Sequence, residues 1–169
     1  MTTMIAGVER RALEPHTDAR GTLREVWRSS QRAIDVRQVL VTVSLPNALR
    51  GMHYHLRQTD LVFVTSGRVS MALIDLRDDV AAKHQFVFGE GESLLIPPGV
   101  AHGYATERGA TTCYLLTTEV DGSDEFGFRF DDPEAALAWP TATPTLSPRD
   151  RDAGALATAL AHVRRSFAA

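Results

Sequence analysis

The side chains best suited to chemistry gather in one short run, Arg50-Gly51-Met52-His53-Tyr54-His55. Side chains alternate along a strand, so His53 and His55 are expected to point to the same face. Arg50 has the opposite parity, and it shares that face only if Gly51 or a bulge bends the strand, which glycine permits. Paired imidazoles suit proton transfer near neutral pH or the binding of a transition metal. Two histidines with a purely structural role are the alternative, which the neighbouring arginine and tyrosine disfavour.

A second cluster runs from Gly91 to His102 in the pattern Gly, five residues, Pro-x-Gly, two residues, His. The pattern predicts a strand that ends at a Pro-Gly turn, followed by a strand that aims His102 inwards. This spacing fits the second motif of the cupin superfamily. Together with the His-x-His pair it predicts an all-β cupin jelly roll with a short C-terminal helix.

One interpretation of these clusters is a metal-dependent cupin enzyme. Such enzymes hold a divalent ion with a His-x-His pair, a nearby carboxylate and a later histidine, all acceptable ligands for iron, manganese, nickel or zinc. Here the corresponding set is His53, His55, Asp60 and His102. Against it, the carboxylate is aspartate where glutamate is usual, and the glycine expected before the first histidine is absent.

Nine short segments spread along the chain carry a further resemblance. They are Asp18-Ala19-Arg20-Gly21 with Glu25, residues 38–44, residues 50–54, Asp75-Leu76-Arg77, residues 96–104, residues 114–117, residues 128–133, Trp139-Pro140 and residues 146–150. In this order they resemble motifs of the dTDP-4-dehydrorhamnose 3,5-epimerase family. Its members are cofactor-free cupins, usually homodimers, that act on a nucleotide-linked 4-keto-6-deoxyhexose. The resemblance therefore implies an isomerase with no cofactor and no metal.

The resemblance also implies roles for individual residues. His53 matches the base that removes a proton beside the ketone, Asp150 the carboxylate paired with that base, and Tyr114 the acid that returns a proton on the other face. Asp150 on its own could equally be a helix cap. The substrate-binding positions are Arg20, Glu25, Gln38, Arg50, His102 and Asp60, with the two arginines expected on the diphosphate.

Three positions in these motifs depart from the family. Asp60 takes the place of a lysine near the enolate oxygen, Val120 replaces a tyrosine that packs on the nucleotide, and Leu40 replaces an asparagine. Of the 18 basic residues 17 are arginine, so the only lysine, Lys83, cannot fill the enolate position. These changes count against inversion at both carbons and favour a single-position epimerase. The prediction is therefore a dTDP-sugar epimerase that inverts carbon 3, carbon 5 or both. A metal-dependent cupin, a 3,4-ketoisomerase and a non-catalytic sugar-nucleotide-binding cupin remain as alternatives.

The elements that must position these residues are short strands separated by turns. Alternating or β-branched runs predict strands at residues 22–27, 39–45, 61–65, 69–76, 85–88, 93–96 and 111–118. Residues 140–148 are expected to cross to a helix over residues 151–167, for which Asp152 is a candidate cap. We expect one cupin domain over residues 1–169. Residues 1–30 would be a strand segment at the dimer interface, 31–130 the jelly-roll core, and 131–169 the crossing segment and helix.

The composition of the chain excludes several classes of binding partner. The chain has 169 residues and a net charge of -3, so it has no basic field for nucleic acid. No apolar run is long enough to span a membrane, and no signal sequence is recognisable. The single cysteine, Cys113, allows no internal disulfide. The expected location is the cytoplasm, and the expected partners are a dTDP-linked 4-keto sugar and a second copy of the chain.

Overall fold

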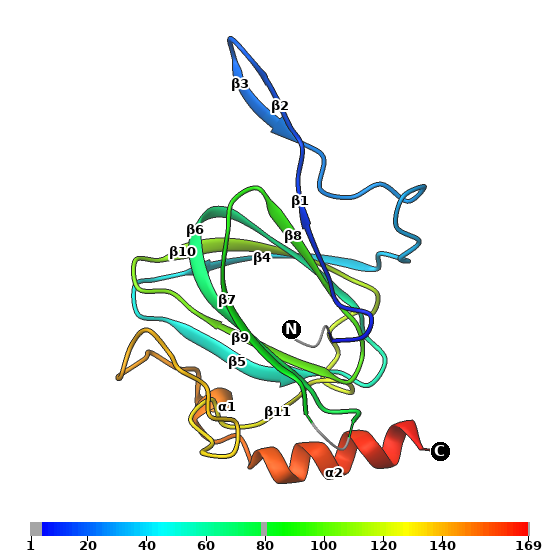
Figure 1. Cartoon of the computed structure of the whole chain (residues 1–169), viewed down its shortest axis with the longest axis vertical. Helices are drawn as coiled ribbons and strands as arrows, with labels where there is room; N and C mark the ends of the chain where they lie inside the picture. Colours follow the sequence, from blue (N-terminus) through cyan, green and yellow to red (C-terminus); the bar gives the residue numbers. More distant parts are fainter. Residues whose placement is uncertain (1–4, 79–80, 169) are drawn as a thin grey trace.

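The structure is a computed structural model that describes residues 5–78 and 81–168. Its first antiparallel sheet contains, in spatial order, β1 (Glu9–Ala12), β8 (Glu92–Ile96), the first half of β6 (Asp60–Asp75), β10 (Ala110–Leu116) and β4 (Gln38–Ser44). The second contains β7 (Lys83–Gly89), the second half of β6, β9 (Val100–Ala105), β5 (Leu49–Tyr54) and β11 (Phe126–Gly127). The strands curl around a common interior (Figure 1). The predicted all-β jelly roll is confirmed.

The long strand β6 belongs to both sheets. Residues 60–63 pair with β8, and residues 70–75 pair with β9. Gly67 lies between these halves at φ 84°, and a Cβ there would approach the Gly109 carbonyl oxygen to 2.7 Å. The sequence predicted two strands separated by Ser66-Gly67. That prediction was wrong, because Gly67 bends the strand without ending its pairing.

Two apolar clusters stabilise the barrel. The first fills the space between the sheets and includes Val62, Leu94 and Phe88. The second joins the outer side of β5, β6 and β9 to helix α2 (Leu156–Phe167), which contributes Leu156, Ala159 and Val163. Alternation along the strands thus buries one set of side chains inside the barrel and another beneath the helix.

The C-terminal segment differs in detail from its prediction. A separate short helix, α1 (Pro148–Arg151), precedes α2, and Asp152 closes α1 instead of capping the final helix. Helix α2 begins five residues later than predicted, and its N-cap Ala155 offers no side-chain bond. The Asp132 carboxylate, distant in sequence, accepts a bond from the first amide of the helix, at Leu156, at 2.9 Å. The reason is local, because Ser147 caps α1 and Pro148 begins it, so these two residues form a turn of their own.

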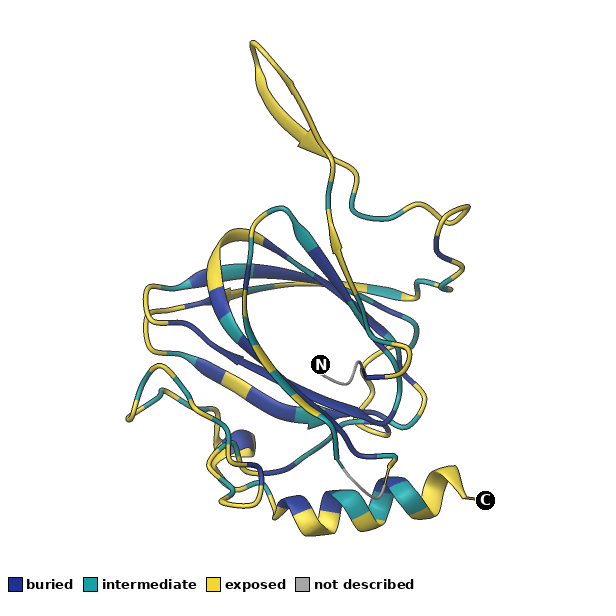
Figure 2. Cartoon of the chain, in the orientation of Figure 1, coloured by how far each residue is buried: buried dark blue, intermediate teal, exposed yellow. Residues whose placement is uncertain are grey.

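The N-terminal segment leaves the barrel. Strands β2 (Pro15–Asp18) and β3 (Gly21–Arg24) pair only with each other. They form a hairpin that projects from the rest of the chain (Figure 1), and every residue in it is exposed (Figure 2). The predicted strand at residues 22–27 is therefore shorter and belongs to this hairpin. Among the described residues, no helix is long and apolar enough to cross a membrane.

Candidate active site

A pocket opens between the sheets and collects most of the chemically capable side chains singled out in the sequence. Strands β4, β5, β6, β9 and β10 all contribute to it. The lining residues include Leu40, Thr42, Arg50, His53, His55, Gln58, Asp60, His102, Tyr104, Tyr114, Val120, Glu125 and Arg149. Five residues with predicted roles, His53, Tyr114, Arg50, His102 and Asp60, are therefore brought together.

An irregularity in β5 places Arg50 and His53 at the same pocket. The pairing of β5 with β9 shifts register between these two residues, and Gly51 adopts φ 125°. A Cβ on Gly51 would lie 2.5 Å from the Cα of Gly103 on β9, so the two backbones approach closely there. The expected bend at Gly51 is confirmed. Arg50 is held in turn by Ser44, whose Oγ accepts a bond from its Nε at 3.0 Å.

His53 contacts Asp150 although 97 positions separate them in the sequence. The His53 Nε2 and the Asp150 Oδ1 are 2.6 Å apart. The Ser147 hydroxyl accepts a bond from the Asp150 amide at 3.1 Å, so the cap of α1 fixes this carboxylate. Burial lowers the pKa of His53, although the bond to Asp150 opposes this effect. Burial would raise the pKa of Asp150, but bonds to His53 and Ser147 outweigh it and lower the pKa.

A second histidine–carboxylate pair lies deeper in the same pocket. The His102 Nε2 is 3.1 Å from the Asp60 Oδ2, and the His55 Nε2 is 3.7 Å from the same oxygen. Burial would lower the pKa of His102, but the bond to Asp60, the charge of Asp60 and the bond to the Val100 carbonyl together outweigh it and raise the pKa. Burial would raise the pKa of Asp60, but His102 and His55 outweigh it and lower the pKa. This pair holds its charges more strongly than the first.

The structure revises the four-residue metal set drawn from the sequence. Within the described residues, the atoms of His55, Asp60 and His102 able to bind a metal lie within 4.8 Å of one another, and His53 is outside this group. The fourth proposed ligand turns its Nε2 to Asp150 instead. The cause is the long-range contact with α1, which the spacing of the histidines did not reveal.

Tyr114 projects from β10 into the pocket. It pairs with Leu40 on β4 and with Val62 on β6. Burial, together with the nearby Tyr104 and Asp60, raises the pKa of the Tyr114 phenol well above its ordinary value. A phenol in this environment stays protonated at neutral pH, so it is able to act as an acid.

Three residues expected to bind substrate do not line the pocket of this chain. Arg20 lies at the end of the β2–β3 hairpin, where it is exposed and pairs with Asp18 at 2.5 Å. Glu25 pairs with Arg28 outside the pocket. The Gln38 side chain accepts a bond from the Val120 amide at 2.8 Å, beside the pocket instead of inside it. Within a single chain these three residues lie outside the pocket, because residues 15–24 form a hairpin that leaves the barrel and Gln38 lies at the end of β4, so their roles in substrate binding stay predictions.

Sequence reasoning missed two residues that organise the pocket floor. Asp124 accepts bonds from three successive backbone amides, at residues 56, 57 and 58. Gln58 donates from Nε2 to the Asp60 Oδ1 at 2.7 Å. Neither residue belongs to a motif. The signal that could have found them is their position in the loops that flank the strands of the two histidine clusters.

Fold and pocket together define a jelly-roll protein of the cupin type with two histidine–carboxylate pairs. A sequence model of the dTDP-4-dehydrorhamnose 3,5-epimerase family matches residues 2–158. The chain therefore belongs to this family, which is a family of isomerases.

Individual relatives agree with this assignment. The spore coat polysaccharide biosynthesis protein SpsL of Bacillus subtilis is 34% identical, over 82% of this chain and 98% of its own length. The dTDP-4-dehydrorhamnose 3-epimerase of Streptomyces niveus is 31% identical, over 92% of this chain and 82% of its own. The crystal structure of NovW, a 4-keto-6-deoxy sugar epimerase of Streptomyces spheroides, aligns with a TM-score of 0.86 at 30% identity, covering 95% and 88% of the two chains.

Proposed function

We propose that this protein is an epimerase of a dTDP-linked 4-keto-6-deoxyhexose and that it inverts carbon 3, carbon 5 or both. The observation that carries the proposal is the 2.6 Å contact between His53 and Asp150 in a pocket that Tyr114 also lines. This arrangement supplies a base with an orienting carboxylate and a separate acid. The epimerase activities for which the two Streptomyces relatives are named support the same substrate class.

In the proposed reaction His53 removes the proton from the carbon beside the ketone. Its Nε2–H is donated to Asp150, which leaves the Nδ1 lone pair to take that proton. The electron pair of the broken C–H bond forms the enolate, and the ketone oxygen takes the negative charge. Tyr114 then gives its phenolic proton to the opposite face, and the enolate returns to the ketone. Solvent takes the proton from His53 and reprotonates the phenolate, which restores the enzyme. Configuration is inverted without net oxidation.

We assign the remaining family positions by their place relative to the pocket. We expect Arg50 to bind the diphosphate, since a guanidinium suits phosphate oxygens. His102 and Asp60 contact the sugar from the pocket floor. Gln38 acts at the pocket rim, where its side chain accepts a bond from the Val120 amide. Only Cys113 is present in the sequence, and it is buried as a free thiol, which supports a reducing compartment such as the cytoplasm.

Arg20 and Glu25 fit the proposal if they act in the pocket of a second copy. We therefore propose a homodimer in which the segment up to residue 30 forms the interface. Residues 31–130 then form the jelly-roll core and residues 131–169 the crossing segment and helix. The projecting hairpin supports this arrangement, because an isolated two-stranded hairpin has little stability of its own.

The deciding experiment is solvent deuterium wash-in followed by NMR. The full chain is incubated in D₂O with dTDP-4-keto-6-deoxyglucose, and label is expected at carbon 3, carbon 5 or both. The variant His53→Asn, checked for folding by circular dichroism, is expected to incorporate none. Folded wild-type protein that incorporates no label at either carbon would contradict the proposal for this substrate.

The same assay separates the other functions considered. Movement of the carbonyl to carbon 3 without inversion would identify a 3,4-ketoisomerase. Tight binding of the sugar nucleotide without exchange would identify a binding protein. Neither outcome depends on the assignment of single residues, so the assay tests the reaction class before any mutant is made.

A further inference from the structure

We propose that His55, Asp60 and His102 form a binding site for one divalent first-row transition-metal ion. His55 directly follows β5, Asp60 begins β6 and His102 lies in β9, and all three residues are buried. The loop after His55 also belongs to the site, because it supplies Gln58. Two imidazoles and one carboxylate are a recognised ligand set for such ions, and they leave coordination positions open.

The two histidine rings are already set to present their Nε2 atoms. The His55 Nδ1 lies 2.6 Å from the Asp124 carbonyl oxygen, and the His102 Nδ1 lies 3.3 Å from the Val100 carbonyl oxygen. A carbonyl oxygen only accepts, so each ring carries a hydrogen on Nδ1, whether the ring is neutral or protonated. Metal-binding histidines are usually held in this way, with the other ring nitrogen donating to a backbone carbonyl.

The contacts of Gln58 show independently which atoms of His55 and Asp60 are hydrogen-bond acceptors. Its Oε1 accepts a bond from Thr118 Oγ1 at 2.5 Å, so the orientation of the amide is fixed. Its Nε2, which only donates, then lies 2.7 Å from the Asp60 Oδ1 and 3.3 Å from the His55 Nε2. The His55 Nε2 is therefore an acceptor. Asp60 has one oxygen held by Gln58 and the other, Oδ2, directed at the two histidines.

Three atoms able to bind a metal thus converge on one point, within 4.8 Å of one another. The Asp60 Oδ2 is 3.1 Å from the His102 Nε2 and 3.7 Å from the His55 Nε2. Without an ion, a proton on the His102 Nε2 satisfies the contact with Asp60, and the Gln58 amide satisfies the His55 Nε2. A divalent ion would displace that proton and bind all three atoms. A second carboxylate oxygen, Glu125 Oε1, lies 3.5 Å from the His55 Nδ1 and adds negative charge beside the site.

The position of this site suggests what the ion would do. It shares the pocket with His53 and Tyr114, so an open coordination position is available to the ketone oxygen of a bound sugar. An ion there would withdraw charge from that oxygen as a Lewis acid and stabilise the enolate. This role rests on the proposed epimerase function, whereas binding of the ion does not. The ion would supply the positive charge that the family motif carries on a lysine, a position that Asp60 occupies in this chain.

The test is a Co²⁺ titration of untagged, full-length protein that has been stripped with EDTA and dialysed. Visible absorption reports the coordination, and elemental analysis reports the stoichiometry, both without substrate. One equivalent is expected to bind saturably, and Zn²⁺ is expected to displace it. Absence of saturable binding at one equivalent would overturn the site.

Variants locate the ion. Asp60→Asn, which keeps the size of the side chain, is expected to weaken Co²⁺ binding at least about a hundredfold. Gln58→Met leaves all three ligands in place and is expected to weaken it about tenfold or more. His53→Asn and His16→Gln each remove a histidine outside the group, so both should bind Co²⁺ within about threefold of the wild type. Unchanged binding in Asp60→Asn, or an equal loss in His53→Asn, would overturn the three-residue assignment.

The experiments distinguish a failure of the proposed metal site from a failure of the proposed epimerase function. If Co²⁺ binds as expected but no deuterium exchange occurs with or without it, the metal site stands and the epimerase proposal fails. If exchange occurs and the ion does not bind, the epimerase stands and the site fails. Where both occur, loading with the ion is expected to raise the exchange rate. A rate that the ion leaves unchanged would overturn its role as a Lewis acid.

Discussion

The pocket contains two histidine–carboxylate pairs whose histidine pKa values are shifted in opposite directions. Burial outweighs the carboxylate at His53 and lowers its pKa, whereas at His102 the bond to Asp60 and the surrounding charges together outweigh burial and raise its pKa. The neighbours explain the difference, since His55 and Gln58 also stabilise the Asp60 carboxylate. Environments that separate the pKa values of like groups commonly separate their roles. A neutral His53 is ready to accept a proton, while the deeper pair retains its charge.

Replacing Asp150 by asparagine tests the first pair. Asp150→Asn removes the bond and the charge that raise the pKa of His53, and it no longer orients the ring. The rate of epimerisation is expected to fall by about 10²–10⁴-fold. The pKa of His53 should fall further, so the acid limb of kcat/KM moves to lower pH, because the neutral base then persists to lower pH. The profile is measured by NMR between pH 4 and 9, and a limb that moves to higher pH would contradict this account.

The role of Tyr114 is tested by removing one oxygen atom. Tyr114→Phe keeps the ring but loses the phenolic proton, so reprotonation on the second face should stop. Inverted product is expected to fall about a hundredfold or more. Deuterium wash-in with retained configuration should continue, because His53 still removes and returns a proton on its own face. Equal loss of wash-in and inversion would assign Tyr114 to binding instead of proton donation.

These residue contacts differ in how far the sequence reveals them. The shared pocket of His53, His55 and Arg50 follows from strand alternation and from the bend at Gly51. The partner of His53 does not, because 97 residues separate it from Asp150 and only the family motifs join them. Gln58 and Asp124 act through side-chain bonds to loop backbone, which leave no periodic pattern in the sequence.

At the scale of elements, the site depends on how closely β5 and β9 approach. Gly51 and Gly103 face each other across these strands, and a Cβ on Gly103 would lie 2.9 Å from the Arg50 carbonyl oxygen and 2.9 Å from the Met52 sulfur. Each strand carries one histidine of the pocket, His53 and His102, and these two are directly paired. The spacing of the backbones therefore sets the spacing of the two imidazoles.

This spacing is testable with a matched pair of glycine substitutions. Gly103→Ala forces β5 and β9 apart, so the free energy of unfolding is expected to fall by about 1–3 kcal/mol. Gly154→Ala is the control, since a Cβ there meets no atom within 4 Å and its φ is not positive. Urea unfolding followed by circular dichroism measures both variants. Equal stability of the two would contradict the close approach.

Element boundaries show where pattern analysis succeeds. Alternating runs located β4, β6, β7, β8 and β10, because each has one face in the barrel and one face outside it. The same reasoning divided β6 at Gly67, since a glycine that bends a strand and one that ends it look alike in sequence. The end of the chain was predicted as one helix, and Ser147 and Pro148 instead begin a separate turn that carries Asp150.

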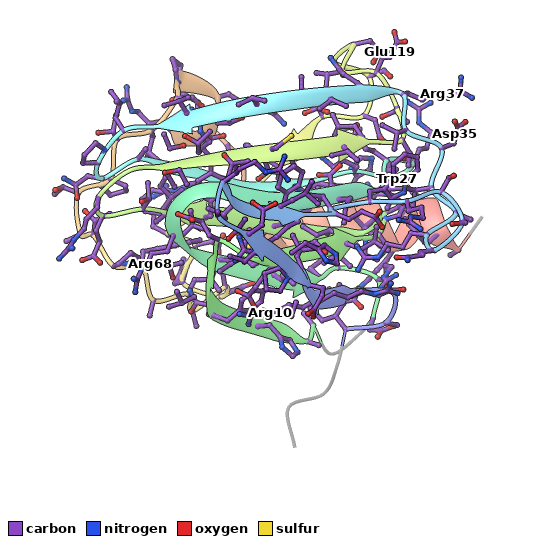
Figure 3. The ribbon with its side chains drawn as sticks, turned by 90° about the horizontal axis from the view of Figure 1, so that it is seen from above. Arg10, Trp27, Asp35, Arg37, Arg68 and Glu119 are labelled. Carbon is purple, nitrogen blue, oxygen red and sulfur yellow. The ribbon has the colours of Figure 1, made fainter. Side chains whose placement is uncertain are left out.

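At the scale of the whole molecule, β4 is an edge strand with an apolar outer face: one of its sides pairs with β10, and the other side pairs with no strand among the described residues. Leu40 and Thr42 line the pocket, while Val39, Val41 and Val43 on the other face are 57%, 68% and 65% exposed. Seen from above, β4 is the outermost strand of its sheet, with Arg37 and Asp35 near one end (Figure 3). Edges of this kind are normally covered or blunted by charge. The proposed homodimer would cover this face.

A single charge on that face tests the dimer. Val41→Glu would bury an unpaired carboxylate in the interface, so the dimer is expected to dissociate at concentrations where the wild type does not. The control Val87→Glu makes the same substitution at an exposed valine of β7, which belongs to the other sheet. Sedimentation equilibrium measures the mass of each protein. A wild type that sediments as a monomer, or a Val41→Glu variant that remains a dimer, would contradict the interface on β4.

Subunit mixing tests whether Arg20 acts in the pocket of the partner. Arg20→Ala and Asp150→Asn are each expected to lose most activity, the first because the diphosphate loses a guanidinium. In a mixed dimer, one pocket then has its own Asp150 and the partner's intact Arg20, while the other pocket lacks both. Random exchange makes half of the dimers mixed, so about a quarter of all pockets should recover, measured as deuterium wash-in. If Arg20 instead served its own pocket, every pocket in the mixed dimer would carry one lesion. Mixing would then restore nothing, and the projecting hairpin would have to be explained by assembly alone.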